Sequence, residues 1–130
     1  MKITGLDHIT INVTDLEKAK AFYEKVIGLA PCGFIDMGDH TLTYYELIPG
    51  VKLELIDYEN KDVPVPVPVT HVGMYRHLCL EVDSLAEFRE RCREHDVVVT
   101  DEPGWVPKLN KNNMLLYDPN GVEIEIFEKE

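Results

Sequence analysis

The two halves of this sequence carry the same pattern, and this internal repeat limits the folds open to the chain. Each half opens on a histidine, at residues 8 and 77, that begins a segment in which apolar and polar residues alternate. Such alternation is typical of a strand with one buried face. Because 130 residues are enough for one domain with a buried core, we expect a single domain of two similar modules.

Each opening strand is followed by a helix signal. Thr14 and Asp15, or Asp83 and Ser84, can cap a helix whose apolar residues recur at helical spacing, and the first helix should end near Gly28. Three further strands are expected in each half, over 33–37, 41–48 and 51–58, and over 97–100, 114–117 and 122–127. The order predicted for each module is therefore β-α-β-β-β.

The boundary between the modules is a proline-rich stretch. Valine and proline alternate over residues 63–69, which excludes a central strand and favours an extended connector. We therefore expect a single domain over 1–130, with module 1 at about 3–60, a connector at 61–70 and module 2 at about 71–130.

Four residues at equivalent places in the repeat are the candidate site. His8 and His77 open the first strands, and Glu54 and Glu125 lie in the last strand of each module. Strand side chains alternate between faces, so these four can share a face while their apolar neighbours enter the core. Two imidazoles and two carboxylates are donors that zinc, nickel, cobalt, iron or manganese accept. The pattern predicts a divalent metal site.

Composition narrows the classes of partner. The formal net charge is −11 and the sequence pI is about 4.8, and clustered basic residues that would neutralise phosphates are absent. Nucleic acid and anionic membrane surfaces are therefore not expected partners. A small-molecule substrate fits better.

Cysteine use and hydropathy indicate the compartment. Cys32, Cys79 and Cys92 form no CxxC pair and are odd in number, so a disulfide framework is not expected. The N-terminal residues lack a continuous apolar segment, and no run approaches the roughly 20 apolar residues of a membrane span. We expect reduced thiols and a cytoplasmic protein.

Other polar and aromatic residues are interpreted more simply. His40, His71 and His95 are expected to be solvated, and Glu81 and Glu123 to lie at the surface or rim of the polar face. The apolar residues that could line a pocket, or equally belong to the core, are Met114, Trp105, Tyr117 and Phe127. An exposed loop is expected to hold Lys108, Asn110, Lys111, Asn112 and Asn113.

Several segments together resemble the vicinal oxygen chelate superfamily, the glyoxalase/bleomycin resistance/dioxygenase fold. They are residues 6–13 with Asp15, Phe22-Tyr23, Gly28-Leu29, 76–83 and 118–125. The resemblance spans essentially the whole chain. It implies an α+β fold in which two tandem βαβββ modules form a cupped mixed sheet with helices on the outer face. It further implies a homodimer and a divalent metal held by His8, Glu54, His77 and Glu125.

The complete ligand set is most similar to that of glyoxalase I. Extradiol dioxygenases and fosfomycin-modifying enzymes of the superfamily generally use two histidines and one glutamate, with no ligand at the place of Glu54. Methylmalonyl-CoA epimerases usually have glutamine there, and bleomycin-binding members lack the metal set. Glu54 therefore favours a lyase or isomerase. A dioxygenase, a thiol transferase and a metal-free module that sequesters a small molecule stay open as alternatives.

The expected chemistry follows from the ligands. A bound cation can act as a Lewis acid on adjacent substrate oxygens and stabilise the enediolate formed when a proton leaves the carbon beside a carbonyl. Glu54 or Glu125 would carry that proton as the catalytic base. The sequence leaves open which glutamate acts, which substrate and metal are used, and whether the ligands come from one chain or two.

Overall fold

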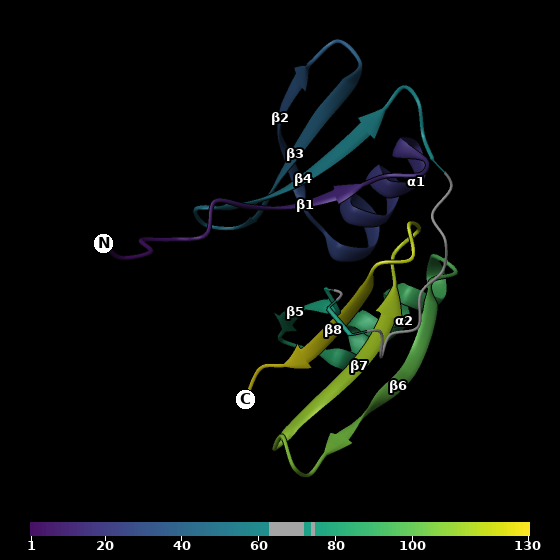
Figure 1. The fold of residues 1–130 in the computed structure, drawn as a ribbon. Helices are drawn as coiled ribbons and strands as arrows, with labels where there is room; N and C mark the ends of the chain where they lie inside the picture. Colours follow the sequence, from purple (N-terminus) through teal and green to yellow (C-terminus); the bar gives the residue numbers. More distant parts are fainter. Residues whose placement is uncertain (63–71, 74) are drawn as a thin grey trace. The chain divides into compact units, whose positions relative to one another are not determined.

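The computed structural model describes residues 1–62, 72–73 and 75–130 (Figure 1). In chain order the elements are β1 (His8–Asn12), α1 (Leu16–Ala21), the π-helical turn η1 (Phe22–Ile27), β2 (Ala30–Asp36), β3 (His40–Ile48), β4 (Val51–Tyr58), β5 (His77–Val82), α2 (Leu85–Glu94), β6 (Val98–Val106), β7 (Lys111–Tyr117) and β8 (Glu123–Glu128). The order β-α-β-β-β predicted for each half is confirmed.

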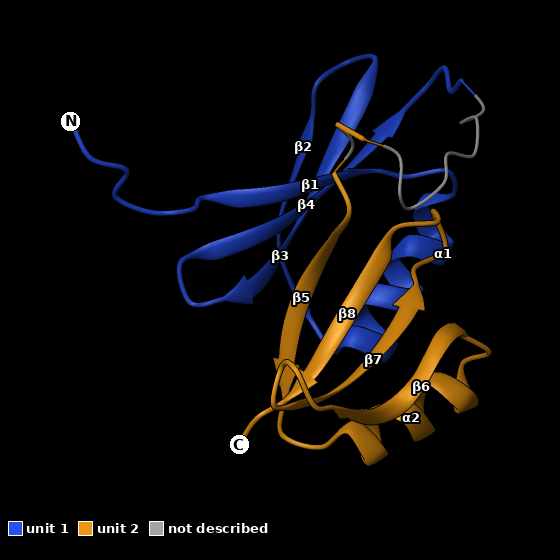
Figure 2. Ribbon diagram, turned by 60° about the horizontal axis from the view of Figure 1, so that its bottom comes forward, with its two compact units in different colours: residues 1–62 blue, residues 63–130 orange. Residues whose placement is uncertain are grey.

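The chain divides into two compact units, residues 1–62 and 63–130 (Figure 2). Each unit holds one four-stranded sheet, in the order β1-β4-β3-β2 in the first and β5-β8-β7-β6 in the second. In both sheets the first and last strands of the unit are parallel neighbours and the other pairs are antiparallel. The sheets are thus mixed, as expected for tandem βαβββ modules. The proline connector lies, from residue 63 on, outside the described residues.

The core of unit 1 consists of alternate side chains of its sheet and one side of its helix. Tyr45 and Leu55 are fully buried, and the Tyr45 hydroxyl donates a 3.0 Å hydrogen bond to Glu24 of η1. Asp15 accepts from the backbone N–H of Lys18 and begins α1, as its capping pattern predicts. Gly28 ends η1 in the left-handed conformation at φ 86°, which glycine adopts without steric cost.

The core of unit 2 repeats this arrangement. The fully buried residues of its sheet are Met114, Leu116, Ile124 and Ile126. Helix α2 lies against β6, β7 and β8 and buries Leu85, Phe88 and Cys92. Ser84 caps α2 by accepting from the backbone N–H of Glu87 at 3.2 Å. The face of the sheet that carries His77 is the one opposite these core residues, because neighbouring side chains along a strand alternate.

Three strands differ from the sequence prediction, and the first of them, β2, begins at Ala30 rather than at residue 33. Strand β6 continues to Val106, and β7 begins at Lys111 rather than at Met114. The pairing between them shifts register twice, between Val99 and Gly104. These bulges take up residues that would otherwise end a strand. The region expected to be a loop at 101–104 is therefore part of the sheet, and so are residues 111–113.

None of the helices in the described part of the chain has the length and apolar character needed to cross a membrane. All three cysteines belong to the described residues and are free thiols, Cys92 buried and Cys32 and Cys79 exposed.

Candidate metal centre

Unit 1 brings its histidine and its glutamate together on one face of the sheet. The His8 Nε2 atom lies 4.0 Å from Glu54 Oε1. On the other side of the ring, His8 Nδ1 lies 2.7 Å from Oδ2 of Asp7. This contact lowers the pKa of the Asp7 carboxyl below its ordinary value. The imidazole therefore lies between two carboxylates, with Nε2 toward the candidate ligand.

Glu54 is held firmly from both neighbouring strands. Thr10 and Tyr44 are its register partners on β1 and β3. The Thr10 hydroxyl donates to Glu54 Oε1 at 3.0 Å, and the Tyr44 hydroxyl donates to Glu54 Oε2. The bond to Glu54 raises the pKa of Tyr44 to about 12, so this phenol stays protonated near neutral pH. With 7% of its surface exposed, Glu54 is a buried carboxylate with a donor on each oxygen.

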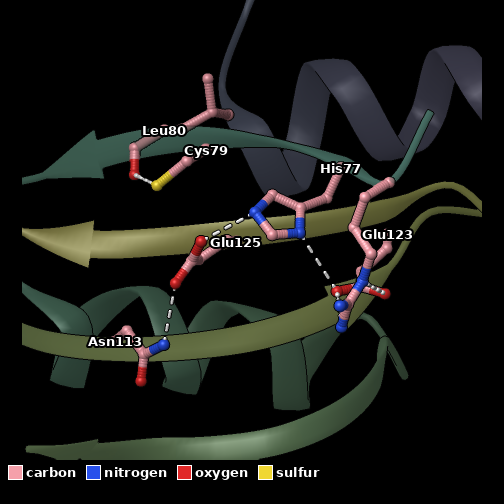
Figure 3. A network of polar contacts seen from close by, with 7 residues as sticks. His77, Cys79, Leu80, Asn113, Glu123 and Glu125 are labelled. Atoms are coloured by element: carbon pink, nitrogen blue, oxygen red, sulfur yellow. Dashed lines mark hydrogen bonds and ion pairs between the residues drawn. The ribbon is translucent and has the colours of Figure 1, made fainter. Parts of the chain in front are cut away.

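Unit 2 brings the second pair closer (Figure 3). The His77 Nε2 atom lies 2.9 Å from Oε2 of Glu125. The amide of Asn113 donates to Glu125 Oε1 at 2.9 Å. Cys79 is the register partner of Glu125, and burial together with the Glu125 charge raises the pKa of its thiol to about 11. Cys79 is therefore a neutral thiol near pH 7 in the metal-free chain.

A second carboxylate lies at the other nitrogen of His77. Glu123 Oε1 is 3.3 Å from His77 Nδ1, and the Arg76 guanidinium lies 3.3 Å from the same oxygen. Glu123 is only 6% exposed, so its expected place at the surface or rim is wrong. The reason is register, since Glu123 lies directly opposite His77 on the parallel pair β5–β8.

These contacts fit a metal at Nε2 of each histidine. A carboxylate accepts hydrogen bonds only, so the carboxylate at Nδ1 can hold the imidazole proton there while Nε2 gives its lone pair to a metal. Two donors that share an ion through bonds of about 2.1 Å are at most about 4.2 Å apart. The separations of 4.0 Å and 2.9 Å are within this limit. Both pairs therefore have the chemistry and spacing of half of a metal site.

Each unit by itself supplies two of the four donors. Among the residues that the structure describes, no three His, Cys, Asp or Glu side chains gather as a metal site. The His8–Glu54 pair and the His77–Glu125 pair belong to different units.

The remaining histidines do not join these pairs. His40 lies at the start of β3 with its Nδ1 2.6 Å from Asp39, and His95 is exposed at the end of α2. His71 lies outside the described residues. Glu81 is exposed and its carboxylate is 3.9 Å from Lys111.

The residues expected to line a pocket or to form an exposed loop differ in their burial. Met114 is fully buried and belongs to the core, while Trp105 is 55% exposed. Tyr117 and Phe127 are half-buried, as are Lys111 and Asn112, whereas Lys108 and Asn110 are exposed. The expected exposed loop is wrong for Lys111, Asn112 and Asn113, which lie in β7, and Asn113 is 7% exposed and contacts Glu125.

A pocket of about 330 Å³ opens beside the first histidine in unit 1. Its walls are formed by Asp7, His8, Cys32, Gly33, Phe34, Ile35, Tyr44 and Lys52. The volume lies at the lower end of the range for small-molecule sites, about 300–1,000 Å³. Phe34 and Ile35 supply an exposed apolar wall, and Lys52 supplies a cation whose Nζ is 5.7 Å from the centre of the Tyr44 ring.

Comparison with known sequences decides the family. The sequence model of the Glyoxalase/Bleomycin resistance protein/Dioxygenase superfamily matches residues 5–126. The chain belongs to this superfamily. The match begins just before the first histidine and ends just after the second glutamate, so it includes both candidate pairs.

Within the superfamily the chain is similar to two kinds of enzyme. It is 30% identical to the ethylmalonyl-CoA/methylmalonyl-CoA epimerase of Cereibacter sphaeroides over 95 residues, 71% of each chain. It is 28% identical to the lactoylglutathione lyase of Salmonella typhimurium, over 93% of this chain and 90% of that protein. The matches to the human and mouse mitochondrial methylmalonyl-CoA epimerases cover 47% and 49% of those proteins, about half of their length.

Solved structures agree on the fold. A glyoxylase/bleomycin resistance protein/dioxygenase domain from Frankia sp. EAN1pec superposes with a TM-score of 0.81 at 17% identity, covering 99% of this chain and 100% of that one. At this identity the likeness concerns the fold alone.

Five residues around the pairs were not predicted from the sequence to contact them: Asp7, Thr10, Tyr44, Asn113 and Glu123. Each contacts a candidate ligand because of strand pairing or chain adjacency. The signal that could have found Asp7 is its place directly before His8, and Glu123 occupies the same face as Glu125 two residues earlier.

Proposed function

We propose that this protein is a metal-dependent lyase or isomerase of the glyoxalase type, which moves a proton at the carbon beside a substrate carbonyl. The observation that carries the proposal is the paired arrangement of His8 with Glu54 and His77 with Glu125, each imidazole holding its Nε2 toward a carboxylate. We propose that these four residues are the ligands. When bound, a divalent ion such as Zn, Ni, Co, Fe or Mn would supply the Lewis acid that polarises the carbonyl.

The two glutamates have different freedom to carry a proton. Both oxygens of Glu54 accept hydrogen bonds from hydroxyls, which fix the position of its carboxylate. Glu125 has one amide donor, Asn113, on Oε1. Its Oε2 faces His77 and has no other hydrogen-bond partner among the described residues. We therefore propose Glu125 as the residue that takes and returns the substrate proton, with Glu54 as the more fixed catalytic carboxylate.

The complete centre needs both units of one chain or units of two chains. We propose that the modules act as one domain over residues 1–130, and the homodimer and cytoplasmic location expected from the sequence stay predictions. In either arrangement the substrate carbonyl would lie near Glu125 Oε2, because a base must be within hydrogen-bond reach of the proton it removes.

A second candidate function is the epimerisation of a 2-carboxyacyl thioester. The relatives named methylmalonyl-CoA epimerase favour it, and so does Lys52, whose ammonium could pair with a substrate carboxylate in the pocket beside His8. Epimerisation returns the proton to the carbon that lost it, whereas glyoxalase-type isomerisation delivers it to the neighbouring carbon. The same base and the same Lewis acid serve both reactions. Glutamine is usual in epimerases at the place of Glu54, so the glyoxalase type leads.

Replacing Lys52 with methionine is expected to distinguish the two candidate functions, epimerisation and glyoxalase-type isomerisation. For methylmalonyl-CoA, Lys52→Met should lower kcat/KM about tenfold, since a hydrogen bond to a charged group contributes about 1.5 kcal/mol. For a hemithioacetal of glutathione with an α-oxo aldehyde, whose reacting end carries no carboxylate, the change should be less than about twofold, which corresponds to about 0.4 kcal/mol. Steady-state assays of metal-loaded protein measure both values.

Lys25→Met is the matched control, because Lys25 is exposed on η1 and does not line the pocket. It removes the same charge from the same unit. Equal losses on methylmalonyl-CoA in the Lys52 and Lys25 variants would contradict a role of Lys52 in carboxylate binding. Failure of the parent chain to act on either substrate, with and without added metal, would contradict the proposed function.

A further inference from the structure

The His8–Glu54 pair and the His77–Glu125 pair differ in where the charged neighbours of the histidine come from. The acidic and the basic neighbour exchange places between the two units. In unit 1 the acidic residue, Asp7, precedes the histidine in the chain, and the residue paired with His8 across the strands is the basic Lys52. In unit 2 the order is reversed. Arg76 precedes the histidine, and the residue opposite His77 is the acidic Glu123.

Both arrangements deliver a carboxylate to the ring nitrogen that faces away from the candidate ligand. The Nδ1–oxygen distances are 2.7 Å from His8 to Asp7 and 3.3 Å from His77 to Glu123. The shared feature is the contact at Nδ1, and its usual effect at a metal site is to fix the ring orientation and the tautomer.

The two carboxylates differ in burial. The Asp7 side chain is 82% exposed, whereas that of Glu123 is 6% exposed. A buried carboxylate is costly unless it is paired. Arg76 supplies the pairing, with Nη2 3.3 Å from Oε1 and Nε 3.4 Å from Oε2 of Glu123. The fold therefore keeps the Glu123 carboxylate buried, at a cost in desolvation, next to Nδ1 of His77.

The contact between Glu123 and His77 is close but not aligned. His77 Nδ1 and Glu123 Oε1 are both buried, and neither has a hydrogen-bond partner of good geometry. Buried polar groups are nearly always satisfied in proteins. At 3.3 Å the two atoms need only a small turn of the imidazole to satisfy one another. With Nε2 bound to a metal, the proton of the neutral imidazole would be on Nδ1, where Glu123 can accept it.

We propose that Glu123 is a positioning residue of the metal centre. Its carboxylate accepts the Nδ1–H of His77 and so presents Nε2 as a donor beside Glu125, while Arg76 keeps Glu123 in place. Asp7 does the same for His8 with a smaller effect, because water competes for its exposed carboxylate. This inference rests on the proposed function, since it needs a metal at His77.

Zinc titration of the metal-stripped full chain tests the inference. Glu123→Met removes the acceptor at similar volume and should weaken Zn²⁺ binding by about 10- to 100-fold, the usual cost of losing an outer partner of a ligand. Glu123→Gln keeps an acceptor oxygen and should recover most of the affinity. Glu81→Met is the matched control, because Glu81 projects from the same face of the sheet but is exposed. It should bind Zn²⁺ within about twofold of the parent, a difference of about 0.4 kcal/mol.

A spectroscopic readout separates positioning from a merely structural role. In the zinc-loaded chain, the His77 Nδ1 proton should give a slowly exchanging NMR signal in the parent and in Glu123→Gln. The signal should be lost in Glu123→Met. A structural role would shift the unfolding temperature of the metal-free chain and leave this proton unchanged.

The outcomes distinguish the inference from the function on which it rests. A parent chain that binds no Zn²⁺ overturns the proposed function. A parent that binds Zn²⁺, with Glu123→Met binding as tightly as Glu81→Met, overturns the inference alone. Equal losses in the two Glu123 variants contradict the acceptor role. If Glu123→Met does not fold, Arg76→Met replaces it and should weaken Zn²⁺ several-fold; unchanged affinity in that variant also overturns the inference.

Discussion

Replacing His77 with alanine is expected to weaken binding of a divalent metal more than 100-fold, beyond the roughly 10- to 100-fold cost of losing an outer partner. The physical reason is the loss of one of four donors and of the ring that lies 2.9 Å from Glu125. Elemental analysis of protein purified without chelators, followed by calorimetric titration with Zn²⁺, Ni²⁺ and Co²⁺, measures the effect.

His95→Ala provides the matched control, since His95 is exposed at the end of α2 and far along the chain from the candidate ligands. Its metal affinity should equal that of the parent. The ligand assignment is wrong if His77→Ala binds each metal as tightly as His95→Ala does. It is equally wrong if the parent takes up none of the first-row divalent ions.

Replacing Glu125 with glutamine is expected to lower kcat by about 10²- to 10⁴-fold, the usual contribution of a general base. Glutamine keeps an oxygen donor and the volume but cannot accept the substrate proton. Glu54→Gln should lower kcat less, because its oxygens are already held by Thr10 and Tyr44. Turnover and metal content measured on the same samples separate loss of the base from loss of the ion.

Glu81→Gln makes the same chemical change on the same face of the sheet, at an exposed position, and should keep parental turnover. If Glu54→Gln abolishes turnover with metal retained and Glu125→Gln does not, the base is Glu54 and the reaction class survives. If both variants retain full turnover, a carboxylate base is excluded.

The order of elements could be predicted because alternation and capping are local properties. Residues such as Asp15 and Ser84 begin the helices where their side chains predict. The length of β6 could not be predicted, because Pro103 and Gly104 usually end a strand. Here the bulges between Val99 and Gly104 let the pairing resume beyond them.

The pairing of each histidine with its glutamate followed from the repeat, but the groups around them did not. The alternation of apolar and polar residues indicates the face of the sheet on which Glu123 lies. It does not indicate which residue of the neighbouring strand lies opposite Glu123. Register decides that His77 is its partner, and register depends on pairing across the whole sheet. Tyr44 and Glu54 meet for the same reason, since they are cross-strand partners on β3 and β4.

Asn113 is a residue whose burial could not be predicted from the sequence. It follows two polar residues, so its composition favoured a loop, yet it lies in β7 and is 7% exposed. Its amide hydrogen bond to Glu125 helps to satisfy a polar group that the strand brings into a buried place. Composition alone does not distinguish such a residue from a solvated one.

Solvent-hydrogen exchange at the reacting carbon tests the central claim most directly. Metal-loaded protein is incubated in deuterated water with methylmalonyl-CoA and, separately, with a hemithioacetal of glutathione, and the deuterium on recovered carbon is measured by mass spectrometry. Proton transfer beside a carbonyl predicts metal-dependent deuterium in at least one product, on the carbon that lost its proton in methylmalonyl-CoA or on the neighbouring carbon in the product of the hemithioacetal. This deuterium should be lost on chelation and in Glu125→Gln. No deuterium and no isomerised product from either substrate, together with oxygen-dependent ring cleavage of a catechol, would contradict the account in favour of a dioxygenase.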